Sequence, residues 1–360
     1  MSKIRIGVVF GGRSGEHEVS VMSAKSIICA LDPQKYEVVP IGLTKQGRWV
    51  LMQESLDLIR AGQLPSLALE QLDPEYSSQI TLLPDPTKNK TLDVIFPVMH
   101  GTYGEDGTLQ GLLELANIPY VGAGVASSAV SMDKGMMRTL FAAAKLPLLP
   151  WVTLSRYQWE QDPHQIVKEI QEKLGYPCFV KPANLGSSVG VSKANSGAEL
   201  NKALCVAAEF DRRIIVEQAA HKPREIECSV LGNDNPMVSI AGEVIPGNDF
   251  YDYEDKYINE NSKLCIPADI TAKQLSIIQD LAIRAYQAVD CAGMARVDFF
   301  LDGHQQILLN EINTIPGFTR ISMYPKLWEA SGVPIHQLVD KLVEYAIERH
   351  QDRSRSRTTI

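Results

Sequence analysis

The sequence lacks any apolar run that approaches the length of a membrane-spanning helix. It also lacks a hydrophobic segment followed by a cleavage site near its start, because the pattern of a strand begins within the first ten residues. From these two absences we expect a cytoplasmic protein without a membrane partner.

Cysteine is scarce, with six among 360 residues, and the scattered spacing excludes the paired arrangement of a metal-binding cluster. Most of the six lie in apolar or strand-like runs, which is typical of reduced thiols in a protein core. They are Cys29, Cys178, Cys205, Cys228, Cys265 and Cys291.

Clusters of basic residues are absent as well. The 43 acidic residues outnumber the 35 lysines and arginines, which gives a net charge of -8, and we expect no nucleic-acid partner. The sequence contains no Walker A or kinase signature, and its first glycine-rich turn is an incomplete dinucleotide fingerprint. A nicotinamide dehydrogenase is therefore a weak alternative.

The composition is otherwise that of a globular chain, and 360 residues predict two or three domains. An apolar strand over Ile4 to Phe10 leads into a glycine-rich turn and then a helical pattern, as at the start of a doubly wound α/β domain. Glu16 in this turn suits a ligand that has an ammonium group, although a charge at a helix end is an equal alternative.

A second turn of the same kind follows the strand predicted over Leu92 to Met99. It reads His100-Gly-Thr-Tyr-Gly-Glu-Asp-Gly and opens a helix near Thr108. Two glycine-rich turns at neighbouring strand ends predict one shared pocket. Taken alone, His100 is more often a structural histidine of a turn than a catalytic one.

Two lysines differ in their surroundings. Lys134 lies inside a helix predicted over Ser127 to Leu140, where a lysine is normally solvated. Lys181 ends an apolar strand, where its burial requires a paired anion. The glycine- and serine-rich loop that follows, residues 183–191, has amides and hydroxyls able to bind phosphate.

Further along, the strand predicted over Ile214 to Gln218 contains Glu217, and Glu225 opens another strand. The segment from Pro246 to Ser262 is long, aromatic, charged and irregular, which favours a functional lid. A helix is predicted over Thr271 to Val289, and a closing amphipathic helix over Ile335 to Arg349.

Between those helices, residues 294–313 have the pattern of an antiparallel hairpin. An even-length loop pairs Asp298 with Glu311 and Arg296 with Asn313 on one face. Opposed carboxylates need a positive group between them, and the oxygen donors of Asp298, Glu311 and Asn313 suit a hard ion such as Mg²⁺. The alternative is a solvated hairpin face.

Taken together, these motifs resemble the ATP-grasp superfamily. Within it, Gly-Gly-Arg-Ser-Gly-Glu-His-Glu-Val-Ser, His-Gly-Thr-Tyr-Gly-Glu-Asp-Gly, Ser-Met-Asp-Lys and Asn-Thr-Ile-Pro-Gly-Phe-Thr are similar to the D-alanine:D-alanine ligase family, in the family's order. The resemblance implies an ATP-grasp fold, α/β at the start and α+β towards the end. It implies an N-terminal domain over 1–123, a central domain over 124–217 and a C-terminal catalytic domain over 218–360, with a lid near 246–262.

The resemblance also implies roles for single residues. Phosphates of ATP are held by Lys134, Lys181 and Lys256, adenine by Glu217 and ribose by Glu225. Two Mg²⁺ ions, for which Mn²⁺ can substitute, are held by Asp298, Glu311 and Asn313. Arg296 and the Gly317 amide hold the oxyanion. Glu16 binds the first D-alanine beside His100 and is hydrogen-bonded to Ser187, which meets Tyr257. Ser322 and Met323 bind the second carboxylate.

The implied reaction is ATP-dependent formation of D-alanyl-D-alanine for peptidoglycan, through a D-alanyl phosphate, in a homodimer. Ligation with D-lactate or D-serine is one alternative, and Tyr257 favours D-alanine over D-lactate. A catalytically inactive ATP-binding protein is another, although every position expected of the catalytic site is filled.

Overall fold

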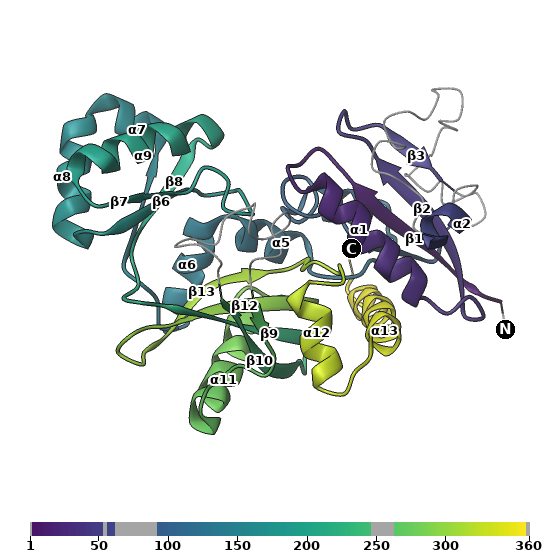
Figure 1. Cartoon of the computed structure of the whole chain (residues 1–360). Coiled ribbons are helices and arrows are strands. Elements are labelled where there is room, and N and C mark those ends of the chain that lie inside the picture. Colours follow the sequence, from purple (N-terminus) through teal and green to yellow (C-terminus); the bar gives the residue numbers. More distant parts are fainter. Residues whose placement is uncertain (1, 53–55, 62–91, 246–262, 358–360) are drawn as a thin grey trace.

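A computed structural model describes residues 2–52, 56–61, 92–245 and 263–357. These residues form three sheets, each in a different part of the fold (Figure 1). In the first sheet, of order β3-β2-β1-β4, strands β2 and β4 run parallel to β1, and β3 runs antiparallel to β2. Its strands are β1 (Ile4–Gly11), β2 (Tyr36–Leu43), β3 (Trp49–Leu51) and β4 (Val94–Pro97). The predicted strand, turn and helix at the start are confirmed.

Helices cover both faces of this sheet, as a doubly wound domain requires. Side chains alternate along β1, so that Ile6, Val8 and Phe10 enter one apolar core and Val9 enters another. On the first face lie α1 (His17–Ala30), α2 (Leu56–Ala61) and α13 (Ile335–Arg353), and on the second lies α4 (Thr108–Leu115).

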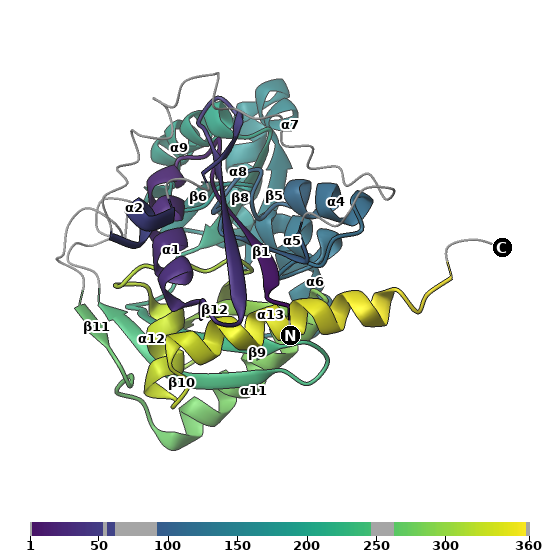
Figure 2. The same cartoon turned by 90° about the vertical axis from the view of Figure 1, so that its right-hand side faces the viewer.

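The helix α13 is the last element of the chain, yet it packs against the first sheet (Figures 1 and 2). Arg349 donates hydrogen bonds to the backbone carbonyls of Gly122 (2.5 Å) and Tyr120 (3.2 Å), and Lys35 pairs with Asp340 at 2.6 Å. The helix continues four residues beyond its predicted end at Arg349. Side chains of the first strand and of the last helix thus share one core.

The second sheet is antiparallel, of order β5-β8-β6-β7, and its core side chains pack against α8 and α9. Figure 1 shows this sheet and its helices as a lobe apart from the first sheet. The elements are β5 (Trp151–Ser155), α7 (Arg156–Gln161), α8 (Pro163–Leu174), β6 (Cys178–Pro182), β7 (Ser192–Ala194), α9 (Gly197–Phe210) and β8 (Arg213–Gln218).

The single helix predicted over Ser127 to Leu140 is wrong. Two helices occupy this region, α5 (Val125–Met132) and α6 (Lys134–Ala143), and the backbone of Asp133 between them is extended. The Asp133 carboxylate accepts hydrogen bonds from the Gly135 and Met136 amides, so a capping residue outweighs the continuous helical pattern. Lys134 is consequently the first residue of α6 and not an interior one.

The third sheet is antiparallel, of order β11-β10-β9-β12-β13, and α11 and α6 pack into its core. Helix α11 lies where predicted, with Thr271 as its N-cap and Val289 as its C-cap. The elements are β9 (Arg224–Gly232), β10 (Met237–Ile245), β11 (Lys263–Cys265), α11 (Ala272–Ala288), β12 (Gly293–Leu301), β13 (Ile307–Asn313) and α12 (Met323–Ala330). This mixture of antiparallel sheets and helices is the α+β part that was predicted.

All six cysteines are free. Cys178, Cys228 and Cys291 are buried, whereas Cys29 and Cys205 are exposed on α1 and α9, so a core position holds for half of the six and not for most of them. Among the described residues, no helix combines the length and the apolar character needed to cross a membrane.

Candidate active site

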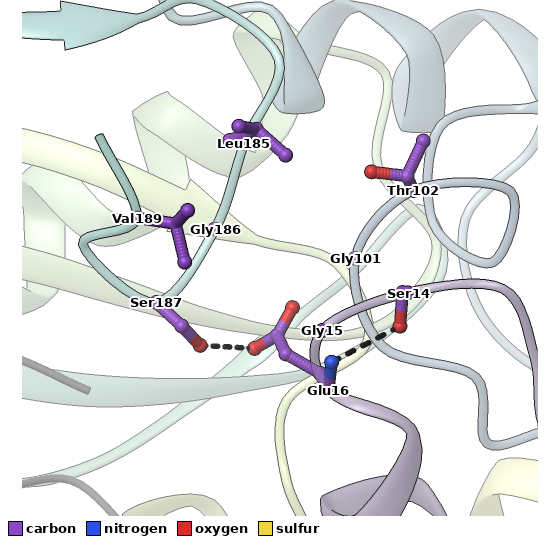
Figure 3. Close-up of a pocket in the computed structure, with 9 residues that line it drawn as sticks. All are labelled: Ser14, Gly15, Glu16, Gly101, Thr102, Leu185, Gly186, Ser187 and Val189. Carbon is purple, nitrogen blue, oxygen red and sulfur yellow. Dashed lines mark hydrogen bonds between the residues drawn. The ribbon is translucent and has the colours of Figure 1, made fainter. Parts of the chain in front are cut away.

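A pocket lies where three loops meet, each of them after the end of a strand (Figure 3). Two of its walls are the β1–α1 turn and the β4–α4 loop, which confirms the shared pocket predicted from the two glycine-rich turns. The third wall is the β6–β7 loop of the second sheet. The lining residues are Ser14, Gly15, Glu16, Gly101, Thr102, Leu185, Gly186, Ser187 and Val189.

Glu16 and Ser187 point towards each other across this pocket although 171 positions separate them (Figure 3). The Ser187 hydroxyl donates a hydrogen bond to Glu16 Oε1, which is the contact expected from the family resemblance. The Glu16 amide donates to Ser14 Oγ (3.2 Å), and that hydroxyl donates to the His100 carbonyl (2.8 Å). Loops from both sheets are therefore joined at the Glu16 carboxylate.

Two glycines allow the close approach of these loops. A Cβ atom on Gly101 would lie 2.5 Å from Glu16 Oε2, and one on Gly186 would lie 3.0 Å from the same oxygen. Gly101 also has φ +73°, which other residues rarely adopt. Ser187 itself has φ +50°, an uncommon value for a serine. The position of the Glu16 carboxylate thus depends on the backbone of both loops.

His100 directly precedes the lining residue Gly101 and is buried, with both ring nitrogens in hydrogen bonds. Nδ1 is 2.9 Å from the Ile315 carbonyl and Nε2 is 3.1 Å from Ser23 Oγ, which also accepts from the Phe318 amide. Burial lowers the pKa of His100, although Glu16 acts to raise it, so the neutral ring donates from Nδ1 and accepts at Nε2. His100 therefore ties the loop after β13 to the first sheet. Its contact with substrate stays a prediction.

Glu105 is a residue that the sequence reasoning missed. It is 8% exposed, and its Oε1 accepts a hydrogen bond of 2.9 Å from the Gly101 amide. Burial, followed by the nearby charge of Glu16, raises the pKa of Glu105 to about 8. The only sequence signal was a charged pair among three glycines, which does not reveal that one of its members is buried.

Lys134 connects the pocket to the β12–β13 hairpin. Its Nζ donates a hydrogen bond of 2.7 Å to the carbonyl of Leu185, a lining residue, and lies 3.9 Å from Glu311 Oε2. Its side chain is 15% exposed. The Lys134 ammonium therefore lies between the β6–β7 loop, which is expected to bind phosphate, and the carboxylates of the hairpin.

Lys181 has the buried anionic partner that the sequence required. Its Nζ donates to Glu217 Oε2 (2.7 Å), while Arg138 Nε donates to Glu217 Oε1 (2.8 Å). Burial alone would raise the pKa of Glu217, but the two cations lower it to about 2. Arg138 was missed, although it lies one helical turn after Lys134 on α6.

The hairpin register is the predicted one: Asp298 lies opposite Glu311, and Arg296 lies opposite Asn313. The predicted even-length loop is wrong, because the turn between the strands spans the five residues 302–306. A bulge at Asn310 shifts the register by one residue and restores the pairing.

The positive group beside Asp298 in this structure is Arg296, whose Nε and Nη2 lie 2.8 and 2.7 Å from the two carboxylate oxygens. Arg296 Nε also lies 3.1 Å from Glu227, a third residue that was missed, although it follows Glu225 at the strand period of two. Burial acts to lower the pKa of Arg296, but the neighbouring carboxylates outweigh it and raise this pKa well above the usual value.

The predicted metal ligands fit a hard cation. Asp298, Glu311 and Asn313 present oxygen donors on one face of two paired strands, and sulfur and imidazole are missing from the set. No group of three or more His, Cys, Asp or Glu side chains is placed to hold a metal within the described ranges, and the predicted set has only two carboxylates. A cation bound by Asp298 would compete with Arg296 for its two oxygens.

The loop after β13 contains Gly317 and leads to the start of α12. Ser322 Oγ accepts from the Thr319 amide (3.0 Å), and a Cβ atom on Gly317 would lie 2.7 Å from that oxygen. The Met323 side chain is buried against Val244 and other residues of an apolar cluster. Of Met323, only the backbone amide at the first turn of α12 is available to a carboxylate.

Three further predicted residues remain. Glu225 lies near the start of β9, half buried and paired in register with Val244 and Phe300. Lys256 and Tyr257 of the predicted lid lie outside the described residues.

Comparisons with known proteins point to one family. Residues 5–123 match the family profile described as D-ala D-ala ligase N-terminus, and residues 140–344 match the profile described as D-ala D-ala ligase C-terminus. The D-alanine–D-alanine ligase of Heliobacterium modesticaldum is 48% identical over 371 residues, covering 99% of this chain and 98% of that protein. The ligase of Solibacter usitatus is 48% identical over 356 residues, covering 99% of both chains.

Solved structures give the same result. The D-alanine-D-alanine ligase from Coxiella burnetii superposes with a TM-score of 0.84 at 40% identity, covering 98% of each chain. The VanG D-Ala:D-Ser ligase from Enterococcus faecalis superposes with a TM-score of 0.83 at 36% identity, covering 96% of this chain and 100% of that one. With both halves matched by family profiles and near-complete coverage by its relatives, this chain belongs to the D-alanine–D-alanine ligase family.

Proposed function

We propose that this protein joins two molecules of D-alanine to D-alanyl-D-alanine, with conversion of ATP to ADP and phosphate, as a step towards peptidoglycan precursors. The observation that supports this most directly is the pocket shared by Glu16 and the β6–β7 loop. A carboxylate suited to an amino-acid ammonium lies there beside backbone amides suited to phosphate. Relatives that match this chain over nearly its full length, and that are named D-alanine–D-alanine ligase, support the same reaction.

In the first step, a carboxylate oxygen of D-alanine attacks the γ-phosphorus of ATP, and the bond to the bridging oxygen of ADP breaks. Glu16 orients the substrate through its ammonium group, and Ser187 orients Glu16. Lys134 and Lys181 offset the charge of the phosphates, which is the main contribution a protein makes to phosphoryl transfer. The product, D-alanyl phosphate, is an activated acyl donor.

In the second step, the amine of another D-alanine attacks the carbonyl carbon, loses a proton, and phosphate leaves. Arg296 and the Gly317 amide stabilise the oxyanion that forms on the way. The carboxylate of this second D-alanine is held at the start of α12 by the Ser322 hydroxyl and the Met323 amide, because the Met323 side chain is buried.

We expect ATP to bind together with two Mg²⁺ ions, for which Mn²⁺ can substitute, held by Asp298, Glu311 and Asn313. When bound, these ions neutralise charge on the phosphates. Adenine lies by Glu217 and ribose by Glu225.

A lid over 246–262 supplies Lys256 and Tyr257 and keeps water from the acyl phosphate. The domains are 1–123, 124–217 and 218–360, the protein is a homodimer, and the use of ATP places the reaction in the cytoplasm.

The identity of the second substrate is the finer part of this proposal. The VanG D-Ala:D-Ser ligase superposes on this chain almost as well as the Coxiella burnetii ligase does, with TM-scores of 0.83 and 0.84. The fold therefore does not select between D-serine and D-alanine. Tyr257 is the reason for proposing D-alanine over D-lactate.

The test is release of phosphate from ATP and Mg²⁺ by the purified protein, with D-alanine, L-alanine, D-alanine plus D-serine, and D-alanine plus D-lactate offered separately and each product identified by mass. We expect release only with D-alanine present and D-alanyl-D-alanine as the main product in every such mixture. Mixed products in excess of the dipeptide would assign another second substrate. Binding of ATP without phosphate release in any mixture would contradict the ligase activity.

A further inference from the structure

Two buried charges, those of Arg138 and Glu217, form one cluster with the partly buried charge of Lys181 between α6, β8 and β6. The Glu217 carboxylate accepts from both cations, at 2.8 Å from Arg138 and 2.7 Å from Lys181. The Arg138 and Glu217 side chains are 1% and 3% exposed, whereas Lys181 is 15% exposed. The lysine is thus the member of the cluster that reaches towards solvent.

In the proposed function the phosphate oxygens compete with Glu217 for the ammonium of Lys181, so Lys181 moves from Glu217 towards the phosphates when a nucleotide binds. A buried carboxylate without a cation is strongly destabilised, so Lys181 could not leave if it were the sole partner. Arg138 provides the second partner, and because it is the more deeply buried cation it can remain in place.

The surroundings of Arg138 indicate that Glu217 is its main partner. The Nη1 and Nη2 groups are buried and have no hydrogen-bond acceptor in the part of the chain that the structure describes. A purely structural buried arginine normally has its donors satisfied. Nε is the group that bonds, and its acceptor is Glu217, so the guanidinium and this carboxylate determine each other's position.

The helix that bears Arg138 is fixed to the second sheet at its first turn. The Lys134 amide donates to the Ala183 carbonyl (3.0 Å), and Asp133 pairs with Arg213 (3.2 Å). A Cβ atom on Gly135 would lie 2.7 Å from the Thr153 side chain, so α6 approaches the sheet closely. Arg138, one turn further along, is therefore held by a rigid support.

We propose that Arg138 is a positioning residue of the nucleotide site, which keeps Glu217 in place as a paired carboxylate so that Lys181 can transfer to the phosphates. This inference rests on the proposed nucleotide site. It predicts that without Arg138 the lysine stays on Glu217 and the phosphates lose their cation.

The test compares the dissociation constants of ADP and adenosine, measured by calorimetry without D-alanine, because their ratio isolates the contribution of the phosphates. In Arg138→Met we expect ADP to bind at least about tenfold more weakly and the ratio to fall by a similar factor, as for loss of one charge-assisted contact. In Arg138→Met combined with Glu217→Gln the lysine has no anion to hold it, and the ratio should recover. Arg138→Lys, which keeps the charge, should keep most of the ratio.

A purely structural role for Arg138 would weaken ADP and adenosine alike, and an unchanged ratio would overturn the proposal. So would failure of the double variant to restore the ratio. Arg284→Met, which removes an arginine that donates to backbone carbonyls away from Glu217, is the matched control and should leave the ratio unchanged. If Arg138→Met does not fold, Arg138→Gln removes the same charge and retains a donor. No binding of ADP to the unaltered protein would instead contradict the proposed function.

Discussion

Arg296 and Asp298, two residues apart on β12, form a bidentate ion pair that occupies both oxygens of the aspartate. Asp298 is also the carboxylate that lies opposite Glu311 and is expected to bind a divalent cation. Arg296 and a cation would therefore compete for the same two oxygens. When a cation takes Asp298, Arg296 keeps one carboxylate partner, Glu227, at 3.1 Å.

Replacing that partner should weaken metal binding. In Glu227→Gln, Asp298 is the main carboxylate left to pair with Arg296, so the arginine competes more strongly with a cation for Asp298. The site also has one negative charge fewer. Both effects weaken binding of the cation. We expect the Mg²⁺ concentration for half-maximal rate to rise about fivefold, equivalent to roughly 1 kcal/mol for one partly solvated charge contact. The measurement is a Mg²⁺ titration of phosphate release at saturating ATP and D-alanine.

Glu243→Gln is the matched control for this prediction. Glu243 and Glu227 are each 7% exposed, and Glu243 pairs with Arg224 on a neighbouring strand of the same sheet. Its replacement should lower thermal stability without changing the Mg²⁺ requirement. Equal shifts in the Mg²⁺ requirement for both variants would show that Glu227 has no special relation to the metal site.

Strand periodicity explains why part of this site was predictable. The alternation of faces placed Asp298 and Glu311 on one face of the hairpin, and the apolar run before Lys181 was sufficient to require a buried anion. Both arguments depend on neighbours in the sequence or across one hairpin. The bulge at Asn310 does not disturb the predicted pairing, because it keeps Asp298 and Glu311 opposite each other on the same face.

The contact between Glu16 and Ser187 was expected only from the family resemblance, and other partners from distant elements were not predictable. The sequence does not reveal that Arg138 meets a carboxylate 79 positions away, or that Glu105 is buried by the loops around it. The break at Asp133 was missed for another reason. A single capping carboxylate competes with a continuous helical pattern, and the spacing of apolar residues alone does not indicate which prevails.

The hydroxyl of Ser187 is expected to matter for binding of the first D-alanine. Ser187→Ala removes the donor to Glu16, so the carboxylate loses its orientation, and we expect the KM for the first D-alanine to rise about tenfold, as for one charge-assisted hydrogen bond. Initial-rate kinetics that separate the two D-alanine sites measure this.

Ser187→Gly is the companion variant, because it also removes the hydroxyl but fits φ +50° without strain. Both variants should raise the KM alike. A normal KM in either would mean that the hydrogen bond has no role in substrate binding.

The Asp133 cap should contribute to both stability and the position of Lys134. Asp133→Ala removes the acceptor for two amides at the start of α6, and we expect a loss of about 1 kcal/mol, or roughly 2 °C in Tm for a chain of this size. Asp133→Asn keeps an acceptor and loses only the charge that pairs with Arg213 at 3.2 Å, so its loss should be smaller. Thermal denaturation compares them, and equal losses would assign the effect to the ion pair and not to the cap.

Glu105 should make the stability of the protein depend on pH near neutrality. Its pKa is about 8 in the folded protein, through burial and the charge of Glu16, and the ordinary value is 4.5. Between these two values the folded state binds the extra proton, so the free energy of unfolding falls as the pH rises. Glu105→Gln mimics the protonated form and cannot ionise. We therefore expect Tm of the variant minus Tm of the unaltered protein to increase from pH 5 to pH 8, corresponding to about 1 to 3 kcal/mol for one buried polar group.

Replacing Glu16 separates the two causes of this effect. Glu16→Gln removes the neighbouring charge but leaves Glu105 buried, so the pKa of Glu105 should fall only part of the way towards its ordinary value. In the Glu16→Gln background the gain from Glu105→Gln at pH 8 should then be smaller but still present. A Tm difference that stays constant between pH 5 and pH 8 would mean that Glu105 is ionised in the folded protein. A gain in Tm that vanishes in the Glu16→Gln background would assign the raised pKa of Glu105 to charge repulsion rather than burial.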